Sequence, residues 1–313
     1  MRDLRIVFMG TPDFAVATLD AVVNAKFNVV GVITAPDKPA GRGRKLQQSA
    51  VKTYAQEKGL TILQPTNLKN EDFIEELKAL KANLQIVVAF RMLPNIVWQI
   101  PEFGTFNLHA SLLPNYRGAA PINWAIINGD TKTGVSTFFI DEKIDTGNII
   151  LQEETPIAEN ETVGELHDRL MNIGSELVVK TVRLIEQGAV KTIKQPEIEE
   201  NPAPKIFTET CKIDWNNSIE NIFNLIRGLN PYPAAWCVLH NEEEIKVKIY
   251  DISKELIQHN DAPGKVISTK HEIKVAALNG YIKIESLQLA GKKKMDSKSL
   301  LNGFSFLENA QML

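Results

Sequence analysis

The chain has 313 residues, 44% of them hydrophobic, which is enough apolar sequence to build the cores of two domains. A net charge of −3 excludes a chain that binds polyanions over its whole surface, so any nucleic-acid contact must come from a local cluster of cations. Cys211 and Cys237 lack metal or redox spacing, which favours free thiols and no metal site. Without a signal peptide or a membrane-spanning apolar run, the protein is expected in the cytoplasm.

Apolar runs alternate with helical patterns over the first part of the chain. In chain order the sequence predicts a strand over 5–9, a helix over 14–25, a strand over 28–33, a helix over 71–82, and strands over 84–89, 104–109 and 134–140. Thr162 and Glu165 form the capping box of a long helix that continues to about residue 187. The alternation predicts an α/β domain with a Rossmann-like, mostly parallel sheet covered by helices on both faces.

The first strand does not lead into a dinucleotide-binding loop. Gly10 is followed by Thr11, Pro12 and Asp13, where that loop needs its second and third glycines. The ordinary fingerprint for a dinucleotide is therefore absent.

The segment 35–46 concentrates positive charge. It carries four cations against the single acid Asp37, namely Lys38, Arg42, Arg44 and Lys45. Two prolines and two glycines interrupt it, which predicts a long flexible loop. Such a loop fits a phosphate backbone, although a charge run is also common on an ordinary solvated surface.

Asn107 and His109 lie two residues apart at the end of the predicted strand 104–109, so both side chains leave the same face. An amide and an imidazole at one point can hold a developing oxyanion, and the imidazole can also move a proton. This pair indicates acyl or formyl transfer. The alternative is a buried histidine that a backbone carbonyl satisfies.

The character of the chain changes after the long helix. Pro196, Pro202 and Pro204 forbid regular structure and indicate a linker. Beyond it the sequence predicts a helix over 218–227 and short strands over 236–239, 245–252, 265–267, 273–277 and 281–289, which suggest a small barrel. The predicted domains are 1–189 and 209–313, joined by the linker 190–208. From Thr210 onward, thirteen Lys and Arg face twelve Asp and Glu, so only a one-sided distribution makes this part basic.

The run Asn-Leu-His-x-Ser-Leu-Leu-Pro-x-x-Arg-Gly over 107–118 closely resembles the signature of the folate-dependent formyltransferases. The resemblance implies an active site of Asn107, His109 and Asp145, the last in a later Asp-x-Gly segment, with Asp145 orienting His109 and helping to take a proton. It implies 10-formyltetrahydrofolate as formyl donor and co-substrate, in a site lined by Ser111, Leu112, Leu113 and Pro114. For Asp145 alone, the alternative is an ordinary turn residue before Gly147.

Two further segments are similar to the methionyl-tRNA formyltransferase family: Pro-Asp-x-Pro-Ala-Gly-Arg-Gly-x-Lys-Leu over 36–46, and Ile-Arg-Gly-Leu-Asn-Pro-Tyr-Pro-Ala-Ala over 226–235. This resemblance implies methionyl initiator tRNA as the partner, bound by Lys38, Arg42, Arg44 and Lys45 and by an OB-like β-barrel domain. Lys292, Lys293 and Lys294 are the cations proposed for that barrel, and a solvated turn is the alternative. No protein partner is expected, which predicts a monomer. One departure from the family pattern lies at Phe90 and Arg91.

Two other classes stay open. A related formyltransferase that acts on a small amine, such as a nucleotide sugar or glycinamide ribonucleotide, keeps the polar triad without needing the basic loop. A non-catalytic tRNA-binding protein needs the loop and the barrel without the triad. Because the sequence carries both sets, it favours transfer of a formyl group to methionyl initiator tRNA.

Overall fold

The computed structural model describes residues 1–40, 45–197 and 201–313. Backbone contacts divide the chain into two compact units. The first unit contains Met1–Gly118, Thr133–Thr155 and His167–Pro202, and the second contains Ala119–Lys132, Pro156–Leu166 and Ala203–Leu313. These units interleave along the chain, whereas the predicted domains 1–189 and 209–313 are continuous, and those boundaries stay a prediction.

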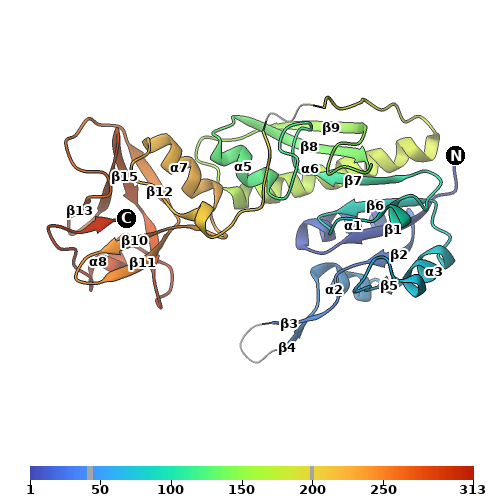
Figure 1. Cartoon of the computed structure of the whole chain (residues 1–313), viewed down its shortest axis with the longest axis horizontal. Coiled ribbons are helices and arrows are strands. Elements are labelled where there is room, and N and C mark those ends of the chain that lie inside the picture. Colours follow the sequence, from blue (N-terminus) through green and yellow to red (C-terminus); the bar gives the residue numbers. More distant parts are fainter. Residues whose placement is uncertain (41–44, 198–200) are drawn as a thin grey trace. The chain divides into compact units, whose positions relative to one another are not determined.

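A seven-stranded sheet forms the centre of the first unit (Figure 1). In spatial order its strands are β5 (Ile62–Leu63), β2 (Asn28–Ile33), β1 (Arg5–Gly10), β6 (Leu84–Val88), β7 (Thr105–His109), β8 (Lys132–Phe139) and β9 (Ile149–Pro156). The pairs from β5 to β7 are parallel, and β8 runs antiparallel to β7. The predicted mostly parallel α/β fold is therefore confirmed, although β5 and β9 were not anticipated.

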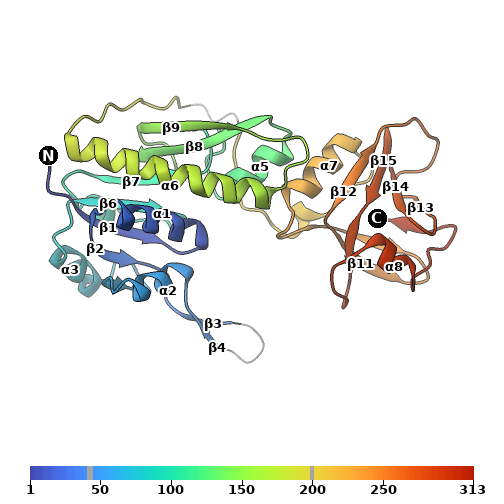
Figure 2. The same cartoon turned by 180° about the vertical axis from the view of Figure 1, so that it is seen from behind.

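Helices cover both faces of this sheet. They are α1 (Asp13–Asn24), α2 (Ala50–Glu57), α3 (Glu71–Ala79), α4 (Asn95–Trp98) and α6 (Val163–Gln187). Val7 of β1 shares one apolar cluster with Phe73 of α3 and Val97 of α4. On the other face, α6 lies against the sheet (Figure 2). Leu108 of β7 packs so closely against Gly174 of α6 that a Cβ there would lie 2.8 Å from a Leu108 methyl group.

The capping box of α6 forms as predicted. The backbone N–H of Thr162 donates to the Glu165 carboxylate over 2.8 Å, and the Glu165 N–H donates back to the Thr162 hydroxyl over 3.3 Å. Two backbone donors at the start of the helix are thus satisfied. No helix among the described residues is both long and apolar enough to cross a membrane.

The second unit is rich in β-structure, as the sequence predicts. One antiparallel sheet has the order β17 (Met295–Asp296), β16 (Ser286–Leu289), β11 (Glu244–Ile249), β10 (Ala235–His240) and β18 (Gln311–Met312), and another has the order β12 (Ile252–Glu255), β15 (Gly280–Ile284), β14 (Ile273–Ala277) and β13 (Val266–Ser268). The unit also contains α5 (Pro121–Ile127), η1 (Glu209–Cys211), α7 (Ile219–Gly228) and α8 (Ser297–Leu301). Side chains of both sheets and of α7 share one apolar core.

Two strands that the sequence predicts as continuous are broken at one corner. The run 245–252 divides into β11 and β12, and the run 281–289 divides into β15 and β16. At the break the Asp251 carbonyl accepts from the N–H groups of Glu285 and Ser286, over 2.8 and 3.0 Å. Because β11 and β16 belong to one sheet and β12 and β15 to the other, both chain segments change sheets here. The two continuous strands were therefore wrong.

The cationic segment is not a loop throughout. β3 (Lys38–Ala40) pairs antiparallel with β4 (Lys45–Gln47), so its two ends form a short ladder. This ladder was not predicted, because the prolines and glycines mask any strand periodicity. Arg42, Arg44 and the side chain of Lys45 lie outside the described residues.

Candidate active site

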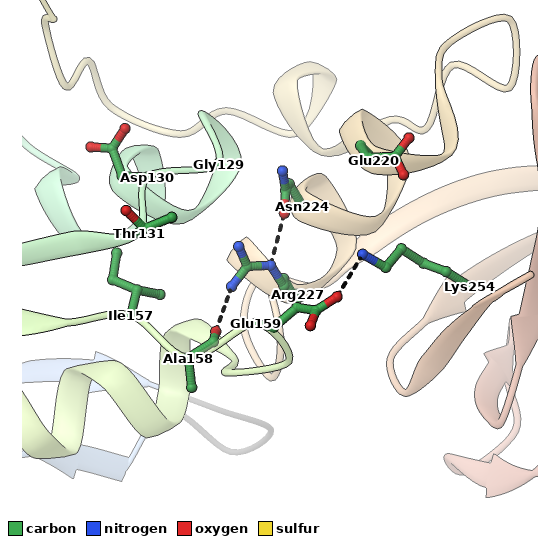
Figure 3. Close-up of a pocket in the computed structure, with 10 residues that line it drawn as sticks. All are labelled: Gly129, Asp130, Thr131, Ile157, Ala158, Glu159, Glu220, Asn224, Arg227 and Lys254. Atoms are coloured by element: carbon green, nitrogen blue, oxygen red, sulfur yellow. Dashed lines mark hydrogen bonds and ion pairs between the residues drawn. The ribbon is translucent and has the colours of Figure 1, made fainter. Parts of the chain in front are cut away.

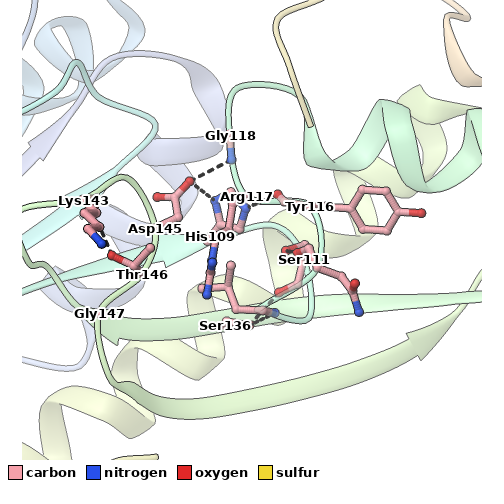
Figure 4. A network of polar contacts seen from close by, with 12 residues as sticks. His109, Ser111, Tyr116, Arg117, Gly118, Ser136, Lys143, Asp145, Thr146 and Gly147 are labelled. Atoms are coloured by element: carbon pink, nitrogen blue, oxygen red, sulfur yellow. Dashed lines mark hydrogen bonds and ion pairs between the residues drawn. The ribbon is translucent and has the colours of Figure 1, made fainter. Parts of the chain in front are cut away.

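His109 ends β7 with its side chain almost fully covered, at 6% exposure. Its Nε2 lies 2.8 Å from the carbonyl oxygen of Tyr116 (Figure 4). A carbonyl can only accept a hydrogen bond, so Nε2 carries the proton. Nδ1 is then the nitrogen that remains for chemistry.

Asp145 faces that free nitrogen. Its Oδ2 lies 3.8 Å from His109 Nδ1 and accepts a 2.9 Å hydrogen bond from the backbone N–H of Gly118. A separation of 3.8 Å is too long for a hydrogen bond. The Tyr116 carbonyl makes the hydrogen bond to the imidazole, and the orientation of His109 by Asp145 stays a prediction.

The Asp-x-Gly segment has a geometric explanation. A Cβ on Gly147 would lie 1.7 Å from the Phe139 carbonyl oxygen of β8, so no other residue fits that approach. Asp145 has φ +54°, a left-handed conformation that Asp tolerates better than most residues. Asp145 can therefore be both a turn residue and a residue of the site, because the turn directs its carboxylate toward His109.

Asn107 is half buried and lies on the same face of β7 as His109, since Leu108 between them packs against α6. Its side-chain amide makes no hydrogen bond with any residue that the structure describes. An amide held on a central strand beside the imidazole, with its donors unused, is suited to bind a substrate oxygen.

The predicted folate-binding turn divides into two kinds of residue. Ser111 is buried, and its hydroxyl donates to the Asn115 carbonyl over 2.7 Å. Leu113 is also buried, and its N–H donates to the Ser136 hydroxyl over 3.1 Å. Leu112 and Pro114 are half buried. The buried pair shapes the turn, and folate binding by the four residues stays a prediction.

The hydrogen bonds of three residues near His109 and Asp145 were not predicted from the sequence. Arg117 donates to Gln195, and Gly118 donates to Asp145. Arg117 and Gly118 belong to the signature run, but nothing in the pattern says which groups they bind. Gln195 lies in the predicted linker and is 5% exposed, a degree of burial that no sequence signal indicated.

In the ranges that the structure describes, no cluster of three or more His, Cys, Asp or Glu is arranged to hold a metal ion.

A hollow of about 300 Å³ lies elsewhere, within the second unit (Figure 3). Across it, Arg227 of α7 donates to the carbonyls of Ala158 and Glu161, over 3.4 and 3.0 Å, and Lys254 pairs with Glu159 over 3.2 Å. None of the predicted site residues lines it. Its polar groups serve to join α7 to the segment 156–166.

His109 and Asp145 thus face each other at the carboxyl end of a central strand of an α/β sheet, and Asn107 lies on the same face of that strand. A family model described as formyl transferase matches residues 4–182, and one described as formyl transferase, C-terminal domain, matches residues 205–305. The chain belongs to the formyl transferase family.

Two relatives and one solved structure show which members of the family this chain is similar to. Methionyl-tRNA formyltransferase of Flavobacterium johnsoniae is 59% identical over 314 residues, covering 100% of both chains. The Bacteroides fragilis enzyme of the same name is 54% identical, covering 99% of this chain and 98% of the relative. The crystal structure of WlaRD, a sugar 3N-formyl transferase, in the presence of dTDP and 5-N-formyl-THF has a TM-score of 0.64 and 23% identity, covering 94% of this chain and all of WlaRD. That last likeness shows the fold alone.

Proposed function

We propose that the chain transfers the formyl group of 10-formyltetrahydrofolate to the α-amino group of methionyl initiator tRNA, as an enzyme of translation initiation. The observation that carries this proposal is the 59% identity to a methionyl-tRNA formyltransferase over the full length of both chains. Within that frame, His109 and Asp145 face each other beside the unused amide of Asn107.

The reaction is an attack by the amine nitrogen on the formyl carbon. The new carbon–nitrogen bond forms as the formyl oxygen becomes an oxyanion, and the bond from that carbon to the folate nitrogen then breaks. The proton lost by the amine ends on the leaving nitrogen, so the formyl group moves without an oxidant or a metal. A free α-amino group has a pKa of about 8, so a useful fraction is already uncharged near neutral pH.

Each residue of the site has a distinct task in this scheme. The Asn107 amide donates to the developing oxyanion. His109 works through Nδ1, because Nε2–H is bound to the Tyr116 carbonyl. Asp145 stabilises the imidazole when it is positively charged during proton transfer. With the amine already nucleophilic, positioning of the two substrates is the largest part of the task.

The proposal is tested by incubating the purified protein with methionyl initiator tRNA and 10-formyltetrahydrofolate. We expect N-formylmethionyl-tRNA, with elongator methionyl-tRNA a much poorer substrate. An amino-sugar nucleotide and glycinamide ribonucleotide serve as the small-amine controls. Formylation of either small amine in preference to the tRNA would overturn the proposal.

The single acid of the cationic segment, Asp37, is bound to residues outside that segment. Asp37 pairs with Lys52 over 2.6 Å and accepts from the Gln64 amide over 2.8 Å. These hydrogen bonds, that of Gln64 first, hold the pKa of Asp37 below its usual value. The Asp37 carboxylate is therefore engaged with Lys52 and Gln64, which lie outside the cationic segment.

We expect neutralisation of Arg42 and Arg44 to raise the KM for tRNA and leave the KM for the formyl donor unchanged. The salt dependence of tRNA binding should weaken by about one unit of logarithmic slope for each phosphate that the variant no longer neutralises. The double change Lys69→Gln and Lys78→Gln, which removes two exposed cations of the same unit, is the control. An unchanged KM and slope in the arginine variant would remove the hairpin from the tRNA site.

The β10–β11 face of the second unit combines cations with an aromatic ring. Lys246 Nζ lies 3.8 Å from the centre of the Trp236 ring and Lys212 Nζ lies 5.9 Å from it. Of the predicted Lys292, Lys293 and Lys294, the last pairs with Asp251 over 2.9 Å. Because aromatic rings stack on bases and lysines bind phosphates, we include the face around Trp236 in the proposed tRNA site.

Changing Lys212 and Lys246 to Gln should raise the KM for tRNA with little change in kcat, since neither residue belongs to the catalytic site. The salt slope should fall by about one to two units, as expected when one or two phosphates are no longer neutralised. The matched control changes Lys270 and Lys298, two exposed cations of the same unit, to Gln. Equal KM values for the two double variants would exclude this face.

Location in the cytoplasm and a monomeric state belong to the same proposal. Light scattering of the purified protein, alone and with tRNA, measures the second directly.

A further inference from the structure

Gln195, from the segment predicted as a linker, uses its whole amide within the first unit. Its Nε2 donates to the Asp145 carbonyl over 3.0 Å and to the Gly147 carbonyl over 2.7 Å. Its Oε1 accepts from Nε and Nη2 of Arg117, over 3.2 and 2.8 Å. Two donors and two acceptor positions are all occupied, which leaves this buried amide a single orientation.

Arg117 anchors that amide. Its side chain is buried, and Nη2 donates to the Pro196 carbonyl over 3.0 Å. Among the described residues, no carboxylate lies within ion-pair distance of its guanidinium. The guanidinium donates to Gln195 and Pro196, and its positive charge polarises the Gln195 amide toward stronger donation to the Asp145 turn.

Three consecutive residues connect these contacts to the reacting groups. Tyr116 accepts from His109, Arg117 holds Gln195, and Gly118 donates to the Asp145 carboxylate. Asp145 is thus held twice, through its side chain by Gly118 and through its backbone by Gln195. These contacts help to balance the strain of the left-handed conformation at Asp145.

We propose that Gln195 is a positioning residue of the formyl transfer reaction. By fixing the backbone of Asp145 and Gly147 to Arg117, it sets where the Asp145 carboxylate lies relative to His109 Nδ1. The idea rests on the proposed function, since it assigns Gln195 to the same site. A displacement of about 1 Å between reacting groups is enough to cost roughly a hundredfold in rate.

Kinetics of two Gln195 variants test the proposal. Gln195→Ala should lower kcat by about ten- to a hundredfold and change the KM for the formyl donor by less than about twofold. Gln195→Glu keeps an acceptor for Arg117 but cannot donate to the two carbonyls. If the only role of Gln195 were to satisfy the buried guanidinium of Arg117, Gln195→Glu would have the kcat of wild type. If Gln195 is a positioning residue, kcat should be low in both variants.

Asn83→Ala is the matched control. Asn83 also bridges backbone groups with its amide, accepting from Arg5 N–H over 2.7 Å and donating to the Asp3 carbonyl over 2.7 Å, and it precedes β6 at the opposite end of the sheet from His109. It should lower the melting temperature but leave kcat within about twofold of wild type. A loss of kcat in Asn83→Ala as large as in Gln195→Ala would mean that Gln195 acts only through stability, and would overturn the proposal.

A second measurement does not depend on the substrate. In protein labelled with ¹⁵N-histidine, the His109 signals, assigned as those missing from His109→Gln, should change in both Gln195 variants and stay in place in Asn83→Ala. Lack of formylation by the wild-type protein would refute the proposed function while this measurement still decided the role of Gln195. Unchanged His109 signals and unchanged kcat in the Gln195 variants would overturn the positioning role of Gln195.

Discussion

His109→Ala is expected to lower kcat by roughly a hundredfold to ten-thousandfold, with KM values for both substrates close to wild type. The reason is geometric: Tyr116 fixes the ring through Nε2, so Nδ1 is the nitrogen that faces Asp145. Asn107→Ala should cost roughly a hundredfold or more through the loss of one oxyanion donor. Single-turnover formylation with saturating substrates measures both effects.

His167→Ala supplies the control for this experiment. His167 also lies beside an aspartate, with Nδ1 3.0 Å from the Asp168 carboxylate, but it is only partly buried and belongs to α6. Its removal should leave kcat unchanged. If His109→Ala retained the turnover of His167→Ala, the histidine would be structural, as the alternative reading of the sequence has it.

Asp145→Asn is expected to lower kcat by roughly ten- to a hundredfold while the formyl donor still binds. Asn keeps an oxygen to accept from Gly118 N–H, so the shape of the turn is preserved and only the charge is lost. Two unit charges about 4 Å apart attract by about 4 kcal/mol at an effective dielectric constant of about 20, which limits the loss to roughly a thousandfold. Rates measured across pH test the proton role.

Asp168→Asn, the same change at the exposed carboxylate beside His167, should have no effect on rate. A rate and a pH profile for Asp145→Asn that both match wild type would contradict the assigned role. The melting temperature of Asp145→Asn is the control for the turn, which also depends on the close approach of Gly147 to Phe139. A fall in melting temperature would mean that the loss of rate comes from a disturbed turn and not from the lost charge.

Much of this protein follows from its sequence because the signals are local. The period of the apolar residues predicted the order of β1, α1, β2, α3, β6 and β7, and the Thr162–Glu165 pair marked the start of α6. The spacing of Asn107 and His109 placed both on one face of a strand, which the packing of Leu108 against α6 confirms. Side chains two residues apart on a strand share a face in any fold, so this inference needed no tertiary knowledge.

The tertiary structure decided what depends on residues distant in the chain. The burial of Gln195 against Arg117 joins residues 78 apart in the chain. The turns that bring Tyr116 to His109 and Gly147 to Phe139 are shorter but irregular, and no periodicity encodes any of these contacts. The corner at Asp251 was missed for the same reason, because the alternation of apolar residues continues where the chain changes sheets. Local pattern specifies which face a side chain occupies, whereas only packing between segments determines which group it meets there.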